Sequence, residues 1–392
     1  MTNQTIETIF IACLFIAFYA YLGYGVFLYL LIRLKRIFFN PKYPFDENFI
    51  PTVTFVVPCF NEQDTVADKI KNCLALDYPS GKLEILFITD GSTDGTPEII
   101  SKYPNVKLLH ESPRKGKASA ENRAMGFVNT DITIFSDANT SLPSNAVKLL
   151  VRHYIDPKVG GVSGEKRVLS KVEDSAAGAG EGIYWKYESL LKKWDSELWS
   201  IVGAAGELFS FRTKLFQPIE VDSILDDFML SMRIAQKGFR VLYEPDAYAA
   251  ETASASVKEE LKRKVRICAG GWQSILWLLP ILLPFKNPTL TFQYISHRVL
   301  RWTIVPFLLI LALPLNFLLL EYHAPLYQIL FIGQLLFYVL AVIGWFLETK
   351  KIKVKIVFVP YYFCLMNYAV LAGALRFLRK KQSSAWERSK RA

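Results

Sequence analysis

Two acidic residues follow directly after apolar, β-branched runs of the chain. Asp90 ends "LEILFITD" and precedes "GSTDGT", and Asp137 ends "ITIFSD" and precedes "ANT". Because Asp, Gly, Ser and Thr are common turn residues, either stretch alone would fit an ordinary loop. Two such stretches, with "PCFNE" after a third apolar run, indicate a ligand site instead. Carboxylates there can hydrogen-bond a polar ligand, bind a hard cation or accept a proton.

A sheet must bring these residues together, and the segment that starts at Pro51 predicts one. The runs "TVTFVV", "LEILFI", "VKLLH" and "DITIFS" are typical of buried strands. Helices are expected over Glu62–Leu76, from "GTPEIISKY" onward and over "KGKASAENRAMGFVN". Alternating strands and helices imply an α/β domain with a mostly parallel sheet. Such sheets bind ligands beyond the carboxyl ends of their strands.

Five motifs occur in order: "VVPCFNEQDTV", "ITDGSTDGT", "RKGKASAEN", "FSDANT" and "LDDFMLSMRIAQKGFRVLYEP". Together they resemble the catalytic domain of membrane-bound family 2 glycosyltransferases, a group that includes cellulose, hyaluronan and poly-N-acetylglucosamine synthases. The resemblance covers about Pro51 to Gln273. It implies the GT-A fold, with a mostly parallel mixed sheet, flanked by transmembrane helices. It also implies an enzyme that transfers a sugar from a nucleotide-sugar.

The resemblance assigns the first two motifs to the donor nucleoside. Asp90 would hydrogen-bond the uracil or ribose, although Thr89 stands where family members often carry a further acid. Asp94 either contacts the ligand or caps the next helix, a role that its position suits. The pocket itself would be lined by Pro58, Phe60, Asn61 and Glu62.

"SDANT" corresponds to the family's DxD motif, with Asp137 first and Asn139 in place of the second acid. A carboxylate and an amide oxygen suit Mg²⁺ or Mn²⁺, which would neutralise the departing diphosphate. The loss of one carboxylate should weaken metal binding in the absence of donor. Lys117, in "KGKA", is either a phosphate contact or an exposed surface lysine.

"DDFML" places Asp226 and Asp227 at the start of an amphipathic helix that ends near Gly238. Acids are favoured at a helix N-terminus by the macrodipole, so a structural role is also open. By the resemblance, Asp227 is the general base that removes the acceptor hydroxyl's proton, and Asp226 lies at the acceptor site. One in-line displacement inverts the anomeric centre, so an α-linked donor gives a β-glycoside.

"VGAAGELFSFRTKLF" resembles the stretch that lines the family's acceptor site. The small residues from Gly203 to Gly206 would let a sugar approach the backbone closely. Glu207 is either an acceptor contact or a surface carboxylate.

The clearest departure from the family lies at Arg263–Ile267, where polysaccharide synthases carry Gln-x-x-Arg-Trp and this chain reads "RKVRI". Arg266 is retained and shares a helix face with Arg263, so both could reach the donor diphosphate. The alternative is a basic helix at the lipid surface. Without the acceptor-stacking tryptophan, processive polymerisation is in doubt. Trp272 is close enough in sequence to substitute for it.

The chain of 392 residues is 52% hydrophobic, which indicates membrane segments. The run Ile9–Ile32 is long enough to span a bilayer and lacks the features of a signal peptide. The shorter Trp272–Phe285, with two prolines and two tryptophans, fits an interfacial helix. The further apolar runs are Thr303–Leu320, Ala324–Leu347 and Ile356–Leu375.

The net charge of +10 is concentrated beside these membrane segments, which favours anionic lipid over nucleic acid. The basic cluster after Ile32 places residues 40–265 in the cytoplasm of a plasma or inner-membrane protein. Three later crossings would put the basic C-terminal tail outside. Either Trp272–Phe285 crosses as well, or one later run folds back. The five cysteines have neither metal-ligand nor CxxC spacing and are expected to be reduced thiols.

The expected organisation is an N-terminal transmembrane helix (1–36), a cytoplasmic GT-A domain (40–256), basic and interfacial helices (257–286), C-terminal transmembrane helices (298–376) and a basic tail (377–392). We expect a membrane-embedded, metal-dependent glycosyltransferase that uses a UDP-sugar to build a cell-surface or exported polysaccharide. The alternative is transfer of a single sugar to a lipid, as in glycolipid or polyprenyl-phosphate sugar synthases. A non-catalytic scaffold would have lost the key acids, yet Asp90, Asp137 and Asp227 are all present. The oligomeric state is open.

Overall fold

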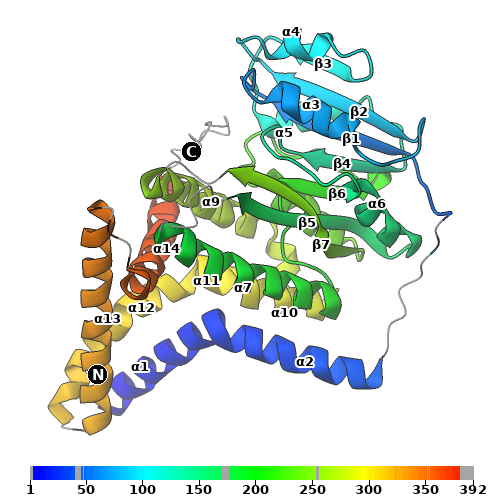
Figure 1. The fold of residues 1–392 in the computed structure, drawn as a ribbon. Coiled ribbons are helices and arrows are strands. Elements are labelled where there is room, and N and C mark those ends of the chain that lie inside the picture. Colours follow the sequence, from blue (N-terminus) through cyan, green and yellow to red (C-terminus); the bar gives the residue numbers. More distant parts are fainter. Residues whose placement is uncertain are drawn as a thin grey trace.

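The computed structural model describes residues 3–39, 46, 48–169, 176–252, 256–322, 324–350, 352 and 354–379, with the backbone alone at 176–184, 322 and 355. The basic tail is thus described only as far as Arg379. Within the described residues, a seven-stranded sheet forms the core of one domain, and long apolar helices lie beside it (Figure 1).

The sheet has the order β3-β2-β1-β4-β6-β5-β7. Strands β1 to β4 are parallel, β6 runs antiparallel to both of its neighbours, and β5 pairs in parallel with β7. The prediction of a mostly parallel mixed sheet is therefore confirmed. The strands are β1 (Val53–Cys59), β2 (Leu83–Asp90), β3 (Lys107–Glu111), β4 (Ile132–Ser136), β5 (Val159–Leu169), β6 (Leu208–Arg212) and β7 (Arg240–Thr252).

Helices cover both faces of this sheet because alternate strand residues point to opposite sides. Phe55 and Phe87 pack on one side with α3 (Val66–Leu74), α4 (Thr96–Ser101) and α6 (Ala146–Val151), beside the turn η2 (Arg152–Ile155). Val56 and Ile88 pack on the other side. The helices of that second side are α5 (Lys117–Met125), α8 (Asp226–Gln236), α9 (Val257–Trp277) and α10 (Pro288–Tyr294), with the turn η3 (Thr213–Leu215).

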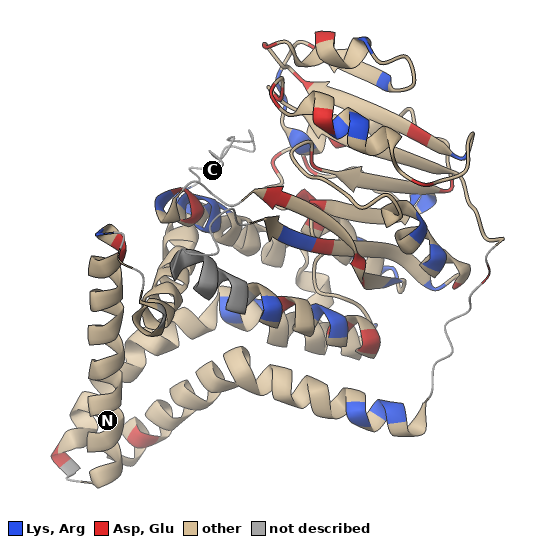
Figure 2. Ribbon diagram, viewed as in Figure 1, with Lys and Arg blue, Asp and Glu red and all other residues tan. Residues whose placement is uncertain are grey.

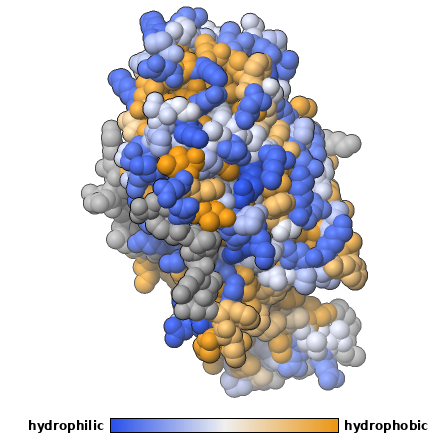
Figure 3. Space-filling model, turned by 90° about the vertical axis from the view of Figure 1, so that its right-hand side faces the viewer, coloured by the Kyte–Doolittle hydropathy of each residue, from blue (hydrophilic) through white to orange (hydrophobic). Residues whose placement is uncertain are grey.

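Three helical runs are long and apolar enough to span a bilayer: Asn3–Phe38, Pro325–Thr349 and Ile356–Leu378. The first joins α1 (Asn3–Phe18) to α2 (Tyr24–Phe38) through a π-helical turn, η1 (Tyr19–Gly23). The other two are α13 (Pro325–Thr349) and most of α14 (Lys355–Leu378). Charged residues are sparse along these helices (Figure 2), and apolar side chains gather at the end of the molecule away from the sheet (Figure 3).

A fourth apolar segment is bent. Pro288–Trp302 and Ile304–Leu319 meet at 54°, so they form a fourth span only if they act as one. They comprise α10, η5 (Ile295–Val299), α11 (Leu300–Trp302) and α12 (Ile304–Leu319), and η6 (Leu320–Tyr322) follows. This is the run Thr303–Leu320 extended toward the N-terminus. It is the natural candidate for the run that folds back.

The structure divides the expected interfacial helix over Trp272–Phe285. Trp272 belongs to α9, which continues to Trp277, and only the short turn η4 (Leu279–Leu282) follows. The apolar residues of the whole segment supported one helix in the sequence, but the first half packs into the sheet domain. Ile275 and Leu278 are part of the domain's hydrophobic core.

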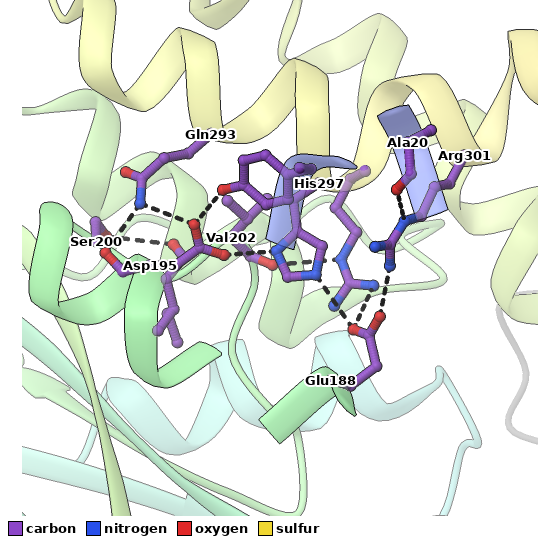
Figure 4. Close-up of polar contacts among 11 residues, drawn as sticks. Ala20, Glu188, Asp195, Ser200, Val202, Gln293, His297 and Arg301 are labelled. Carbon is purple, nitrogen blue, oxygen red and sulfur yellow. Dashed lines mark hydrogen bonds and ion pairs between the residues drawn. The ribbon is translucent and has the colours of Figure 1, made fainter. Parts of the chain in front are cut away.

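Helix α7 (Ala176–Leu198) joins the sheet domain to the apolar helices (Figure 1). Leu191 packs against Tyr24 and Leu28 of α2. Figure 4 shows its polar side: Asp195 accepts hydrogen bonds from the Gln293 amide at 2.9 Å and lies 2.6 Å from His297 Nδ1.

Candidate active site

The loops that follow β1 and β2 are joined to each other. The Asn61 N–H donates to Ser92 Oγ at 3.1 Å, and Asn61 Oδ1 accepts from the Thr93 N–H at 2.8 Å. The next N–H, of Glu62, donates to Thr96 Oγ1 at 2.8 Å. Asn61 has a φ of 52°, a left-handed conformation that asparagine tolerates better than most residues. "PCFNE" and "GSTDGT" therefore form one surface at the carboxyl edge of the sheet.

Asp94 also connects the loops that follow β1 and β2. Its carboxylate accepts the N–H of Thr96, the first residue of α4, and the N–H of Gln63, each at 3.1 Å. The first contact is an Asx-turn that leads into α4, whose N-cap is Gly95, and the second joins the two loops. Both suit the structural alternative for this residue.

Asp90 is buried at the end of β2, where it holds a third loop. Its two oxygens accept the N–H groups of Lys115 and Gly116, each at 2.8 Å. Gly91 has a φ of +68°, and a Cβ there would lie 2.6 Å from the backbone nitrogen of Arg114. The loop is therefore pressed against the strand end. A direct contact of Asp90 with a nucleoside stays a prediction.

The loop after β1 also carries an aromatic ring that contacts a cation. The Arg114 guanidinium lies 3.7 Å from the centre of the Phe60 ring. Phe60 is two residues after the buried Pro58. A ring and a planar cation at the edge of such a sheet suit a base and its phosphates.

Three acids form ion pairs with Lys117 where β4, α5 and α8 meet. The Lys117 ammonium lies 2.9 Å from Asp137, 3.4 Å from Asp226 and 3.8 Å from Glu121. Although burial opposes it, Asp137 and Asp226 hold the pKa of Lys117 well above its usual value. Lys117 is thus mostly buried and ion-paired, unlike an exposed surface lysine.

The cluster has more negative than positive charge. In the ion pairs of the described residues, the single ammonium of Lys117 is shared by Glu121, Asp137 and Asp226. Burial raises the pKa of Asp137 despite Lys117, and burial with Asp226 raises the pKa of Glu121. A further positive charge at this point would relieve both effects.

The residues present fit a divalent cation that is held partly by the protein and partly by the phosphate oxygens of a bound donor. Asn139, two residues after Asp137, is partly exposed, and its amide has no hydrogen bond among the described residues. No group of three or more His, Cys, Asp or Glu side chains within the described part of the chain could hold a metal alone. Asp137 and Asn139 would therefore need oxygens from a phosphate to complete the coordination.

Asp227 occupies the first turn of α8, next to Asp226. Burial, followed by the charge of Asp226, raises the pKa of Asp227 to about 7. A Cβ added to Gly206 would lie 3.0 Å from Asp227 Oδ2, and one added to Gly203, at φ +86°, would lie 2.2 Å from the Phe228 ring. These two glycines are needed so that the backbone can approach "DDF" closely.

Glu207 is neither exposed nor isolated. It forms an ion pair with Lys166, which also pairs with Glu251. Against the effect of burial, Lys166 holds the pKa of Glu207 below its usual value. The surface alternative for Glu207 is therefore wrong.

A cavity of about 710 Å³ opens between the sheet domain and the apolar helices. Its domain wall includes the expected base Asp227 and three residues expected to bind donor or acceptor, Gly203, Glu207 and Arg263. Its far wall includes Tyr21 and Leu22 of the first apolar run and six residues of α14 that are apolar or aromatic: Val359, Tyr362, Phe363, Met366, Ala369 and Val370.

Other expected residues do not line this cavity, including Gly206 and Asp226 of the expected acceptor site. Arg266 and Trp272 are absent from its lining, which includes Arg263, Lys264 and Ile267 from the same helix. The tryptophans that line it are Trp185 of α7 and Trp302 of α11. Arg263 donates hydrogen bonds from Nη2 and Nε to the two oxygens of the Glu260 carboxylate, at 2.8 and 2.9 Å.

Sequence reasoning missed the charged residues on the far wall. Glu188 binds Arg301 at 2.6 Å and Arg298 at 3.1 Å, and Arg301 Nε donates to the Ala20 carbonyl in η1 at 2.8 Å (Figure 4). The π-turn frees this carbonyl from its usual helical partner. One signal was available: "SHRVLR" places three basic side chains in an otherwise apolar segment, where ionisable residues are usually functional.

Comparison with known proteins agrees with this geometry. Residues 54–219 match the family "Glycosyl transferase family 2". The poly-beta-1,6-N-acetyl-D-glucosamine synthase of Staphylococcus aureus strain MSSA476 is 28% identical over 247 residues, 60% of this chain and 58% of that protein. The synthase of Staphylococcus epidermidis is 24% identical over 352 residues, 84% of each chain. The match thus spans less than two thirds of the S. aureus relative.

Among solved structures, the mannosyltransferase PcManGT from Pyrobaculum calidifontis, in complex with GDP-Man and Mn²⁺, is 24% identical with a TM-score of 0.71. The likeness covers 96% of this chain and all of that one, helices included, and it establishes the fold. Residues 54–219 therefore form a family 2 glycosyltransferase domain, built on the GT-A fold and flanked by helices that can span a membrane.

Proposed function

We propose that this protein is a membrane-embedded, inverting glycosyltransferase. It takes a sugar from a nucleotide-sugar, UDP-linked by the sequence reasoning, and adds it in β-linkage to a growing cell-surface or exported glycan. One observation carries the proposal: neighbouring acids at the start of α8 serve two sites. Asp226 contacts Lys117 in the acidic cluster, while Asp227 lines the cavity.

The donor would lie along the carboxyl edge of the sheet. Phe60 and Arg114 would hold the nucleoside, and Lys117 would meet the diphosphate. Asp137 and Asn139 would hold Mg²⁺ or Mn²⁺, which, when bound, neutralises charge on the departing diphosphate. The known ligands of PcManGT, GDP-Man and Mn²⁺, support this arrangement by analogy.

The acceptor would enter from the cavity, with its hydroxyl at Asp227. Asp227 takes the hydroxyl proton as the oxygen attacks the anomeric carbon, and the bond from that carbon to the diphosphate breaks. Attack from the opposite face inverts the centre, and no enzyme nucleophile is needed. A pKa of about 7 suits this role, because the base is ionised near neutral pH yet retains proton affinity.

The staphylococcal relatives support polysaccharide as the product. The cavity supports a second candidate, transfer of a single sugar to a lipid, because its far wall consists of the helices that can span a membrane. In both cases the sheet domain would face the cytoplasm of a plasma or inner membrane, as the basic residues after the first helix indicate.

The test uses the full-length protein in membranes, a panel of radiolabelled UDP- and GDP-sugars, and Mg²⁺ or Mn²⁺. Products are separated into lipid-soluble and polymeric fractions. We expect transfer with one donor, loss of it in Asp227→Asn, and retention in Asp222→Asn, an exposed aspartate five residues earlier. Polymer would refute single transfer. Unchanged activity in Asp227→Asn would refute the assigned base.

A further inference from the structure

The cavity has an excess of positive charge. Six basic residues line it against three acidic ones: Lys166, Lys192, Arg263, Lys264, Arg298 and Arg301 against Glu188, Glu207 and Asp227. Five of the six have carboxylate partners. Arg298 and Arg301 pair with Glu188, Lys166 pairs with Glu207, and Arg263 and Lys264 pair with Glu260.

Lys192 is the exception. Among the residues that the structure describes, its ammonium has neither a hydrogen bond nor an ion pair, and its one contact is the Tyr243 ring, 6.0 Å away. The residue is only 7% exposed, and the cavity is where it is accessible. Burial lowers the pKa of Lys192, so its charge is poorly stabilised as the structure stands.

Three acids act on Lys192, namely Glu165, Glu207 and Glu188, and within the described part of the chain none of them forms an ion pair with it. Glu165 acts on Lys192 only through space, since its two oxygens already accept the hydroxyls of Ser189 and Tyr243. Arg298 lies close enough to lower the pKa of Lys192 further. Two cations that disfavour each other at a cavity wall are best compensated by an anion with more than one negative charge.

The cavity also determines what carries that anion. Leu22 of the first apolar run and Val359, Phe363, Met366 and Val370 of α14 line the same space. Both helices are long and apolar enough to cross a bilayer. A hydrocarbon chain can therefore lie between them while its polar end reaches Lys192 and faces Asp227.

We propose that the cavity binds a phosphate-bearing lipid as the acceptor or as its carrier, with the phosphate on Lys192 and Arg298 and the apolar chain between the first helix and α14. Its role as acceptor rests on the proposed function, whereas the binding itself does not. A phosphate ester supplies the required charge and the oxygen acceptors that both cations can reach.

The first experiment measures binding to the wild-type protein in detergent without donor, through the fluorescence of Trp185 and Trp302 at the cavity wall. The probes are geranylgeranyl phosphate, geranylgeraniol and inorganic phosphate. We expect saturable binding of the lipid phosphate, and binding of each of the other two that is weaker by about tenfold or more. Equal binding of the alcohol would overturn the phosphate site. Equal binding of inorganic phosphate would overturn the claim that the ligand is a lipid. Tighter binding of a uronic-acid oligosaccharide, tested as a fourth probe, would overturn it as well.

The second experiment compares variants. Lys192→Met should weaken binding of geranylgeranyl phosphate by about tenfold and leave geranylgeraniol unchanged, while Lys192→Arg retains affinity. Lys193→Met, at the adjacent exposed lysine, is the matched control. Unchanged affinity in Lys192→Met overturns the proposal. If Lys192→Met fails to fold, the affinity of Lys192→Arg and the comparison of the probes decide whether the phosphate site exists.

The two proposals fail differently. Binding of the lipid phosphate without sugar transfer, for any donor, would refute the proposed function and leave this site standing. Transfer to neutral acceptors that Lys192→Met does not alter would refute the site and leave the glycosyltransferase activity standing.

Discussion

The pH dependence of transfer is the most direct test of Asp227. With a pKa of about 7, roughly a tenth of its side chain is ionised at about pH 6 and nine tenths at about pH 8. Since only the carboxylate accepts the proton, kcat/KM for the acceptor should rise about tenfold over that range and then level off. Asp227→Asn should lower the plateau by ~10²–10⁴-fold and abolish the acidic limb.

The neighbouring acid sharpens the test. Asp226 raises the pKa of Asp227 by repulsion, so Asp226→Asn should move the acidic limb to lower pH. Rates are measured as nucleotide release at constant ionic strength and normalised to each variant's plateau, because Asp226 also contacts Lys117. Asp222→Asn should keep the wild-type profile. An acidic limb that persists in Asp227→Asn, or fails to move in Asp226→Asn, would refute the reasoning.

Three further outcomes are expected. Gly91→Ala should raise the donor KM by about tenfold, because the left-handed backbone disfavours a side chain and the Cβ would meet Arg114. Thermal unfolding serves as the control: a variant that remains folded at the assay temperature shows that the higher KM is not caused by misfolding. Chelation of divalent cations should abolish transfer, and added Mn²⁺ should restore it. Asp137→Asn should raise the Mn²⁺ concentration needed for half-maximal activity on the order of tenfold, whereas Asp222→Asn should leave it unchanged. Asp195→Ala should destabilise the protein by ~3–5 kcal/mol, because Tyr24, Gln293 and His297 all lose the buried carboxylate that they contact; thermal unfolding in detergent measures this, and an unchanged midpoint would contradict it.

The strands that carry the donor loops could be predicted because their signal is local. β1, β2 and β4 are rich in β-branched and other apolar residues, and polar loop residues follow each strand within two positions. β5 and β7 were missed for the opposite reason. "VGGVSGEKRVL" contains three glycines and three charges, and "RVLYEPDAYAAET" contains a proline, so both resemble loops. Pairing with neighbouring strands, and not propensity, makes them strands.

The chemistry at the sheet edge could likewise be predicted as far as residue type. The state of Lys117 could not be, because Asp226, more than a hundred residues later, buries and pairs it. Lys192 offers no local signal, and the only signal for Arg298 is the group of basic residues in "SHRVLR". Their importance depends on α7 and η5 meeting at one cavity, and on which carboxylates reach which cations.

The altered stretch Arg263–Ile267 takes on a different meaning in the structure. The resemblance places an acceptor-stacking tryptophan at Ile267, and its absence put processive synthesis in doubt. Ile267 still lines the cavity, and so does Trp302 from α11. A Cβ on Gly271, one turn beyond Ile267, would lie 2.5 Å from the Trp302 ring, so the glycine lets that ring lie on α9. The same ring is 5.3 Å from Phe228, the residue after Asp227. An aromatic surface is thus present beside the proposed base, supplied by another helix. The missing tryptophan therefore does not decide between polymer and single transfer, and the cations around Lys192 bear more directly on the acceptor.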